Sequence, residues 1–199
     1  TRGRLVGLLT IENIGELLLV PRGPIGGRAM RRVERLRDAA LIVDGGRIAW
    51  FGPQSTIPTL DAGTRDGETL DAGRGCVLPG LIDCHTHAVF AGTREHEFVQ
   101  RIEGKSYVEI ARAGGGIRTT VDAVRAATDD ELVELTLPRL RRMLQYGVTT
   151  VEIKSGYGLT PIDERKMLDA VKRLKRLQPI ELVPTYLAAH TTPREFEGR

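Results

Sequence analysis

The chain has 199 residues, of which 41% are hydrophobic and 28% are charged, a balance typical of a globular protein with a packed core and unlike that of disordered or fibrous chains. The net charge of +3 comes from 29 basic and 26 acidic residues that are scattered along the sequence, so it favours neither nucleic acid nor a membrane as a partner. No apolar run reaches the roughly 20 residues that a bilayer-spanning helix needs, and two cysteines are too few for a disulfide framework, so we expect a cytoplasmic protein with reduced thiols.

Residues 1–75 are expected to form the N-terminal part of a small β domain. Short β-prone runs, such as residues 17–20 and 40–43, alternate with turn residues there. The sequence Asp44-Gly45-Gly46 separates the second of these runs from another at residues 47–51. An Asp-Gly pair between two β-prone runs predicts a β-hairpin.

From residue 76 onward the pattern alternates between strand and helix, which indicates parallel βα units. The predicted strands are residues 77–87, 148–154 and 180–190, and each ends in polar side chains. A closed (β/α)8 barrel has eight such strands in about 250 residues. Residues 76–199 are therefore interpreted as an α/β region, the first three βα units of an incomplete TIM-like barrel.

The helices between these strands are indicated by their N-terminal sequences. Residues 106–109 and 128–131 both have the Ser/Thr-x-x-Glu form of a capping box, which satisfies free amide groups at the start of a helix. The first helix should be ended by the glycines at 114–116. A third helix is predicted to open at Thr160-Pro161, because the following apolar residues fall on one helical face: Met167, Leu168, Val171 and Leu174.

The first predicted strand of this region carries the clearest chemical signal, in the sequence GLIDCHTHAVFAGTR at residues 80–94. His85 and His87 are two of the chain's four histidines, and residues i and i+2 of a strand point to the same side. Two imidazoles on one rigid strand present nitrogens to one point, as a divalent metal requires. We prefer this metal site to the alternative, a pair of hydrogen-bonded histidines without a metal.

The neighbours of the two histidines have simpler expected roles. Asp83 lies on the same face of the strand, where its carboxylate could accept the second N–H of a metal-bound imidazole or could instead cap the adjacent loop. Both alternatives remain open from the sequence. Cys84 points the other way and is expected to be a buried thiol.

Four sequence blocks resemble a known family. The stretch VLPGLIDCHTH resembles the first barrel strand of the amidohydrolase superfamily. DCHTHAVFAGTREHEF, SYVEIARAGGGI, GVTTVEIKSGYGL and TYLAAHTTPREF, in this order, resemble more specifically the imidazolonepropionase family. The resemblance covers nearly the whole chain, including the β-rich start that ends in GRIAWFGP. It implies the first part of an amidohydrolase-type barrel, preceded by part of a small β-sandwich domain.

The resemblance also implies an activity and a set of site residues. The reaction would be hydrolysis of the cyclic amide of 4-imidazolone-5-propanoate to N-formimidoyl-L-glutamate, a ring-opening step of histidine degradation, with one zinc or iron ion. By position, His85 and His87 would bind the metal, while Arg94, Tyr157 and His190 would line the substrate pocket. Tyr107 would be a further candidate for the same pocket.

The chemistry of this substrate can be compared with these residues. A guanidinium at Arg94 could hold the propanoate carboxylate with two hydrogen bonds. Tyr157 lies between glycines at a strand exit, from which its hydroxyl could reach over the barrel mouth. His190, at the expected end of the third strand, could act as a catalytic residue that hydrogen-bonds or polarises the ring carbonyl. The simpler alternatives are a surface arginine, a packed tyrosine and a structural histidine.

Residues 1–199 alone are expected to be inactive. In the family that the chain resembles, a further histidine ligand, an acidic base and a metal-binding aspartate come from later strands, and two histidines do not complete the three-ligand site of a catalytic metal. One alternative is a dihydroorotase-like or hydantoinase-like dinuclear enzyme, in which Lys154 would be a carboxylated, metal-bridging lysine. Another is a non-catalytic truncated module. The expected partner is a small-molecule substrate, and a homodimer is an open possibility.

Overall fold

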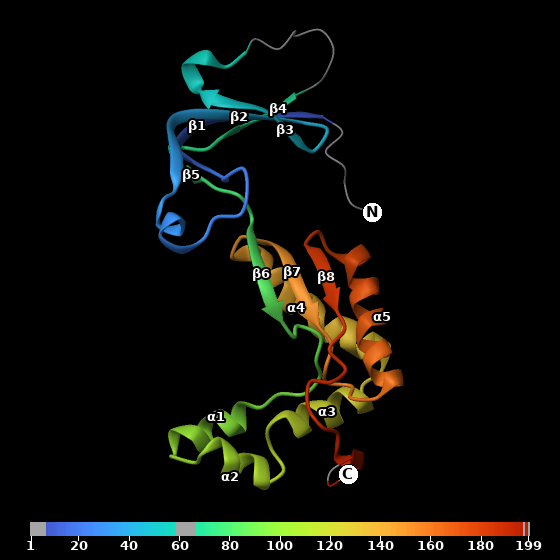
Figure 1. Ribbon diagram of the computed structural model, residues 1–199. Helices are drawn as coiled ribbons and strands as arrows, with labels where there is room; N and C mark the ends of the chain where they lie inside the picture. The colour runs from blue at the N-terminus through green and yellow to red at the C-terminus, as the bar shows by residue number, and fades with distance from the viewer. Residues whose placement is uncertain (1–6, 59–66, 197, 199) are drawn as a thin grey trace. The chain divides into compact units, whose positions relative to one another are not determined.

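A computed structural model describes residues 7–58, 67–196 and 198 of the chain (Figure 1). The chain divides into two compact units, residues 2–79 and residues 80–199. In the described part of the chain, no helix has the length and apolar character required to cross a membrane.

The first unit contains a five-stranded sheet formed by β1 (Leu8–Leu19), β2 (Glu34–Asp44), β3 (Arg47–Pro53), β4 (Gly67–Asp71) and β5 (Cys76–Val77). Antiparallel pairs join β1 to β2 and β2 to β3, whereas β4 and β5 pair with β1 in parallel. Two short 3-10 helices lie at Gly27–Arg31 and Gln54–Thr56. The described residues of this unit form one sheet, so the β-sandwich stays a prediction.

The predicted hairpin of the first unit is confirmed by the β2–β3 pair. Its connection is Gly45-Gly46, and both glycines have positive φ angles, of 57° and 79°, as the tight turn of a two-residue hairpin requires. Strand β1 is longer than the predicted run at residues 17–20. Asn13, with φ of 54°, lies in an irregularity of the β1–β2 register that interrupts the alternating sequence pattern.

The second unit contains a three-stranded parallel sheet in the order β6 (Leu81–Thr86), β7 (Val148–Lys154) and β8 (Glu181–Thr185). The parallel βα arrangement predicted for this part of the chain is therefore observed. Its helices are α1 (Glu95–Ile102), α2 (Tyr107–Arg112), α3 (Ile117–Ala126), α4 (Asp129–Gln145) and α5 (Pro161–Leu177), followed by a 3-10 helix at Arg194–Phe196. Figure 1 shows α4 and α5 beside the sheet, with α1, α2 and α3 grouped beyond the carboxyl ends of the strands.

Both predicted capping boxes are present, at Ser106 before α2 and at Thr128 before α4. Helices α1 and α3 were not predicted from the sequence. Their N-cap residues, Arg94 and Gly116, make no side-chain capping hydrogen bond, so neither helix carries the start signal on which the other predictions depended.

The core of the second unit lies where α4 and α5 pack on the sheet. Met167, Val171 and Leu174 of α5 are buried as predicted, whereas Leu168 is only partly buried. They pack with fully buried side chains of the neighbouring elements: Leu132 and Leu140 of α4, Val151 and Ile153 of β7, and Leu182 of β8. This packing holds the carboxyl ends of β6, β7 and β8 at one edge of the sheet, where the loops with the candidate site residues begin.

The prediction of a single buried strand over residues 77–87 is wrong. Cys76 and Val77 pair with β1 in the first unit, and β6 begins only at Leu81, after Pro79-Gly80. Ile82 is 68% exposed, because β6 is the edge strand of its sheet and its outer face is uncovered by the described residues. For the same reason Cys84 is exposed rather than buried. Both cysteines are free thiols, as expected.

The third strand is also shorter than predicted. Strand β8 ends at Thr185, so His190 follows the strand by five residues rather than ending it. The chain leaves the sheet because the backbone N–H of Leu187 donates to the hydroxyl Oγ of Ser155, at 3.0 Å, instead of continuing the ladder with β7.

Candidate functional site

The two histidines of the motif lie at the carboxyl end of β6. The ring centroids of His85 and His87 are 6.1 Å apart, with the ring planes at 67°. His85 is exposed, whereas His87 is partly buried. Asp83 Oδ1 accepts the backbone N–H of His85 at 3.3 Å, so of its two predicted roles the structure contains the backbone contact.

His87 forms a cluster of rings with two other predicted site residues. Its ring stacks on that of His190, with centroids 4.7 Å apart and planes at 9°, and its centroid is 4.8 Å from that of Tyr157. Nδ1 of His190 lies 3.0 Å from the carbonyl oxygen of Gly156. Because a carbonyl oxygen only accepts, this contact places the hydrogen of His190 on Nδ1 and leaves Nε2 as an acceptor in the neutral ring. Residues from three separate chain segments therefore meet at the end of β6.

His87 is in an environment that favours its neutral form. Burial is the largest effect that lowers the pKa of His87, and the nearby His190 and His85 lower this pKa further, against an opposing contribution from the Ser155 backbone. Its Nδ1 is buried and has no hydrogen-bond partner in the described part of the structure. A neutral imidazole is the form that ligates metals.

These observations fit the presence of a metal only in part. Two imidazoles at one strand end, one of them with an unpartnered buried nitrogen, are suited to act as two ligands of a divalent cation. Within residues 7–58, 67–196 and 198, however, no group of three or more His, Cys, Asp or Glu side chains could hold a metal ion. The residues present are thus compatible with part of a metal site.

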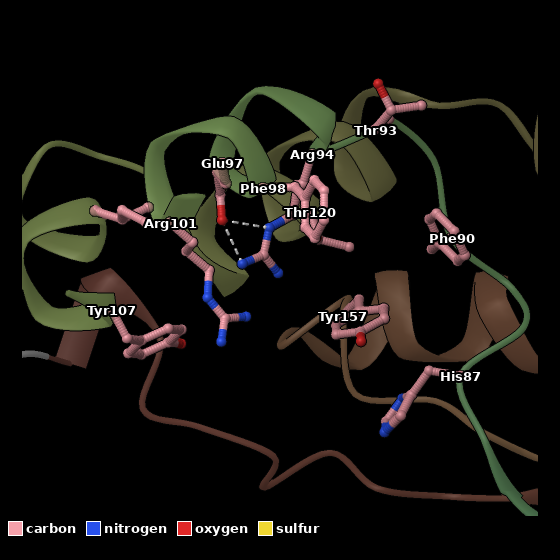
Figure 2. A pocket seen from close by; sticks show the side chains of 12 residues that line it. His87, Phe90, Thr93, Arg94, Glu97, Phe98, Arg101, Tyr107, Thr120 and Tyr157 are labelled. Carbon is pink, nitrogen blue, oxygen red and sulfur yellow. Dashed lines mark hydrogen bonds and ion pairs between the residues drawn. The ribbon is translucent and has the colours of Figure 1, made fainter. Parts of the chain in front are cut away.

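A cavity of about 400 Å³ opens beside the ring cluster, a size within the range of small-molecule sites. Four of the residues predicted for the site line it: His87, Arg94, Tyr107 and Tyr157. Figure 2 shows His87 and Tyr157 at one end of this cavity and Tyr107 at the other. His85 and His190 are not among the lining residues, although the ring of His190 stacks on that of His87.

Arg94 is held in place by a buried carboxylate. Its Nε and Nη2 both donate to Oε2 of Glu97, at 2.9 and 2.6 Å, and Oε1 of Glu97 accepts the backbone N–H of Gly116 at 2.7 Å. Glu97 is 5% exposed. The hydrogen bond to Arg94 is the largest effect that lowers the pKa of Glu97. The third guanidinium nitrogen, Nη1, makes no contact with Glu97 and lies on the side of Tyr157 (Figure 2).

Arg101 is a cavity residue that the sequence interpretation missed. It lines the same cavity as Arg94, and Figure 2 shows its guanidinium between Tyr107 and Arg94. The signal was its place in the run that follows Arg94, where Arg94 is the N-cap residue of α1 and Arg101 lies in the last turn of that helix. It could not be used because α1 itself was not predicted. The cavity therefore carries two cationic side chains at the end distant from the histidines.

Lys154 ends β7, as predicted, and its ammonium group forms an ion pair with Glu152. Carboxylation would replace the cationic side chain by an anion beside Glu152, so this ion pair would be lost. The contact therefore argues against a carboxylated, metal-bridging Lys154.

Solved structures define the class of fold. The chain is similar to a metal-dependent hydrolase of uncharacterised function from Pyrococcus furiosus, with a TM-score of 0.53 and 15% identity, over 90% of this chain and 50% of that one. It is also similar to the guanine deaminase of E. coli, with a TM-score of 0.50 and 16% identity, over 90% of this chain and 36% of that one. These similarities show that the chain shares its fold with both proteins. No family model matches the chain.

Sequence comparison identifies the family within this class. The chain is 50% identical over 191 residues to the imidazolonepropionase of Myxococcus xanthus, which covers 96% of this chain and 45% of that protein. It is 52% identical over 165 residues to the imidazolonepropionase of Hyphomonas neptunium, with 82% of this chain and 41% of that protein covered. The chain belongs to the imidazolonepropionase family and corresponds to its N-terminal part, spanning less than half the length of these relatives. The resemblance seen in the four sequence blocks is confirmed.

Proposed function

We propose that this chain is part of a metal-dependent hydrolase that opens the cyclic amide of 4-imidazolone-5-propanoate to N-formimidoyl-L-glutamate in histidine degradation. The observation that carries this proposal is the cavity in which His87 and Tyr157 face two arginines. The substrate has the matching polarity, with a reactive ring at one end and a carboxylate at the other. The names of the relatives support the same reaction.

The arginine end of the cavity would bind the propanoate tail. Nη1 of Arg94 is free of Glu97, and Arg101 of α1 supplies a second guanidinium to the same cavity. Because Glu97 already accepts from the Nε edge of Arg94, the carboxylate would be bound by one terminal nitrogen of Arg94 together with Arg101, rather than by both prongs of Arg94. Charge-assisted hydrogen bonds of this type are about twice as strong as neutral ones.

The histidine end of the cavity would hold the imidazolone ring. Burial raises the pKa of Tyr157 above its ordinary value, with Arg94 opposing, so the phenol keeps its proton and can donate to a substrate oxygen. With Nδ1 directed at the carbonyl of Gly156, Nε2 of His190 is the ring nitrogen left for the substrate, and His190 would act as the catalytic residue that orients or polarises the cyclic amide. Tyr107 would close the cavity beside the carboxylate.

His85 and His87 would hold one divalent ion, zinc or iron, together with ligands from beyond residue 199. When bound, such an ion would activate water for attack on the cyclic amide carbon. Since two imidazoles do not complete a catalytic metal site, we propose that residues 1–199 alone are inactive and that the remaining ligands and the general base belong to a longer protein containing them.

The experiment compares the complete protein containing these residues with the 199-residue chain. Loss of the ultraviolet absorbance of imidazolonepropanoate should require the complete protein and one equivalent of zinc or iron. Turnover by residues 1–199 alone would refute their inactivity. Absence of turnover by the metal-loaded complete protein would refute the proposed reaction.

A dinuclear cyclic amidohydrolase, with Lys154 carboxylated, is the alternative enzyme. Two metal ions per chain and a lysine mass increase corresponding to carbon dioxide would favour it, and the Lys154–Glu152 ion pair argues against it. A non-catalytic module is the remaining alternative and would be supported by an inactive complete protein. The proposed setting is a cytoplasmic enzyme, a possible homodimer, whose partner is a small molecule rather than nucleic acid or a membrane.

A further inference from the structure

The segment that carries Tyr157 is a tight loop between β7 and α5. Gly156 has a φ angle of 109° and Leu159 one of 56°, so the backbone turns sharply on both sides of the tyrosine. A Cβ atom at Gly156 would lie 2.9 Å from Cβ and Nδ1 of His190. The loop therefore fits closely against His190, and small displacements of its backbone would move both side chains.

One buried side chain, Glu164, binds this loop from within. It lies in the first turn of α5 and is 0% exposed. Its Oε2 accepts the N–H of Gly156, and its Oε1 accepts the N–H groups of both Gly158 and Leu159, each at 2.8 Å. Both oxygens are thus used, and the amides on either side of Tyr157 are bound to one rigid helix.

The contacts continue from this loop to the candidate site. The carbonyl of Gly156 accepts from Nδ1 of His190, so the peptide that donates to Glu164 is adjacent to the one that fixes His190. On the other side, the carbonyl of Gly158 accepts from Nε of Arg125 at 2.8 Å. The loop is held at both ends while the ring of Tyr157 extends to His87.

A carboxylate is costly at a fully buried position unless it is well hydrogen-bonded. The three amide donors satisfy this requirement for Glu164. An apolar side chain could fill the same space without needing any hydrogen bond, but it would leave the three amides unpaired. A glutamine would retain one acceptor oxygen and would turn its NH2 group toward at least one of the three N–H donors. The chemistry of this position is therefore matched to the loop conformation rather than to core packing alone.

We propose that Glu164 is a positioning residue, which acts through the loop at residues 155–159 to hold Tyr157 and His190 against His87. Its effect on turnover rests on the proposed function, but its effect on geometry does not. Since it orients two groups of the site without contacting the cavity itself, its replacement should act on the chemistry through these two side chains.

The test uses the complete protein with Glu164→Gln and, as a matched control, Asp169→Asn, which removes the same charge from an exposed position of α5. Labelled tyrosine and histidine report the proximity of the Tyr157, His87 and His190 rings by nuclear Overhauser effects. Glu164→Gln should weaken these ring contacts and abolish hydrogen-exchange protection of the Gly156 amide, and Asp169→Asn should leave both unchanged. Unaltered ring contacts in folded Glu164→Gln would overturn the proposal.

Kinetics supply the second measurement. Glu164→Gln should lower kcat/KM about tenfold or more, the range typical of residues that orient a site from outside it. In a Tyr157→Phe background the same change should lower kcat/KM by less than about threefold, because the effects of residues that act through one another are not additive. If the double variant instead loses kcat/KM by the product of the two single-variant factors, Glu164 does not act through Tyr157. If Glu164→Gln does not fold, Glu164→Asp, which keeps the charge but shortens the reach, decides by the same ring contacts. The two proposals can fail separately. If the wild-type protein has no turnover but Glu164→Gln shows the predicted loss of ring contacts, the proposed reaction is refuted and the positioning role is supported.

Discussion

The buried carboxylate of Glu97 allows a quantitative test of the site. In the wild-type protein one oxygen of Glu97 accepts from Nε and Nη2 of Arg94, and the other accepts from the amide of Gly116. The change Glu97→Gln leaves only one acceptor oxygen for these donors. Either the charged group or the buried amide then loses its partner, at about 1 to 3 kcal/mol in either case. Because the Arg94 side chain is 37% exposed, water can replace part of its loss, and we expect a destabilisation of about 2 kcal/mol.

Urea unfolding followed by circular dichroism measures this difference, with Glu103→Gln, at the exposed C-cap of the same helix, as the control. For a urea slope of about 2 kcal/mol per molar, the midpoint should fall by about 1 M. The pKa of Glu97 is lowered in the folded state from an ordinary value of 4.5, so its stabilisation is complete above that value and is lost as the pH falls through the lowered folded-state pKa. The gap between wild type and Glu97→Gln should therefore be constant near neutral pH and shrink in acid. Equal midpoints at pH 7 would refute the network.

Four further substitutions test other parts of the structure. Replacing the fully buried Leu140 by alanine should destabilise the second unit by about 2 to 5 kcal/mol. Thr128→Ala, which removes a capping box, should destabilise it by about 1 kcal/mol. Thermal unfolding measures both changes, and equal losses of stability at the two sites would contradict the assigned burial of Leu140. In the complete protein, His87→Ala should abolish tight zinc binding in calorimetry while exposed His96→Ala retains it, so retained binding in the first variant would exclude His87 as a ligand. Arg101→Met should raise KM at least tenfold with a smaller change in kcat, and an unchanged KM would remove Arg101 from carboxylate binding.

Much of the local structure could be predicted because its signals are short and contiguous. Asp44-Gly45-Gly46 determined the β2–β3 hairpin, and the Ser106 and Thr128 capping boxes marked α2 and α4 at their first residues. The missed elements lack such signals. Helix α3 has a glycine, Gly116, as its N-cap residue and so lacks a side-chain cap, and the irregularity at Asn13 breaks the alternation that would have revealed the full length of β1.

The candidate site was predictable only where its residues belong to contiguous motifs. His87, Arg94 and Tyr157 lie in such motifs and line one cavity. Arg101 depends on a helix that had not been recognised. In the sequence Glu164 resembles an ordinary acidic residue in the first turn of a helix, where a negative charge interacts favourably with the helix dipole. Its contacts with Gly156 and Gly158 form only when the preceding loop folds back onto α5. The periodicity of the sequence does not predict this loop conformation.

Arg94 is the N-cap residue of α1 and Arg101 lies in its last turn, which has a consequence for how the proposed activity could diversify. Recognition of the substrate tail would depend on one short helix, whereas the ring-facing groups come from the ends of β6 and β7 and the segment after β8. Exchange of α1 could thus alter which side group is accepted, from a carboxylate to something neutral or cationic, while leaving the bond-breaking apparatus intact. A scaffold divided in this way can acquire new substrates by replacing a single surface element.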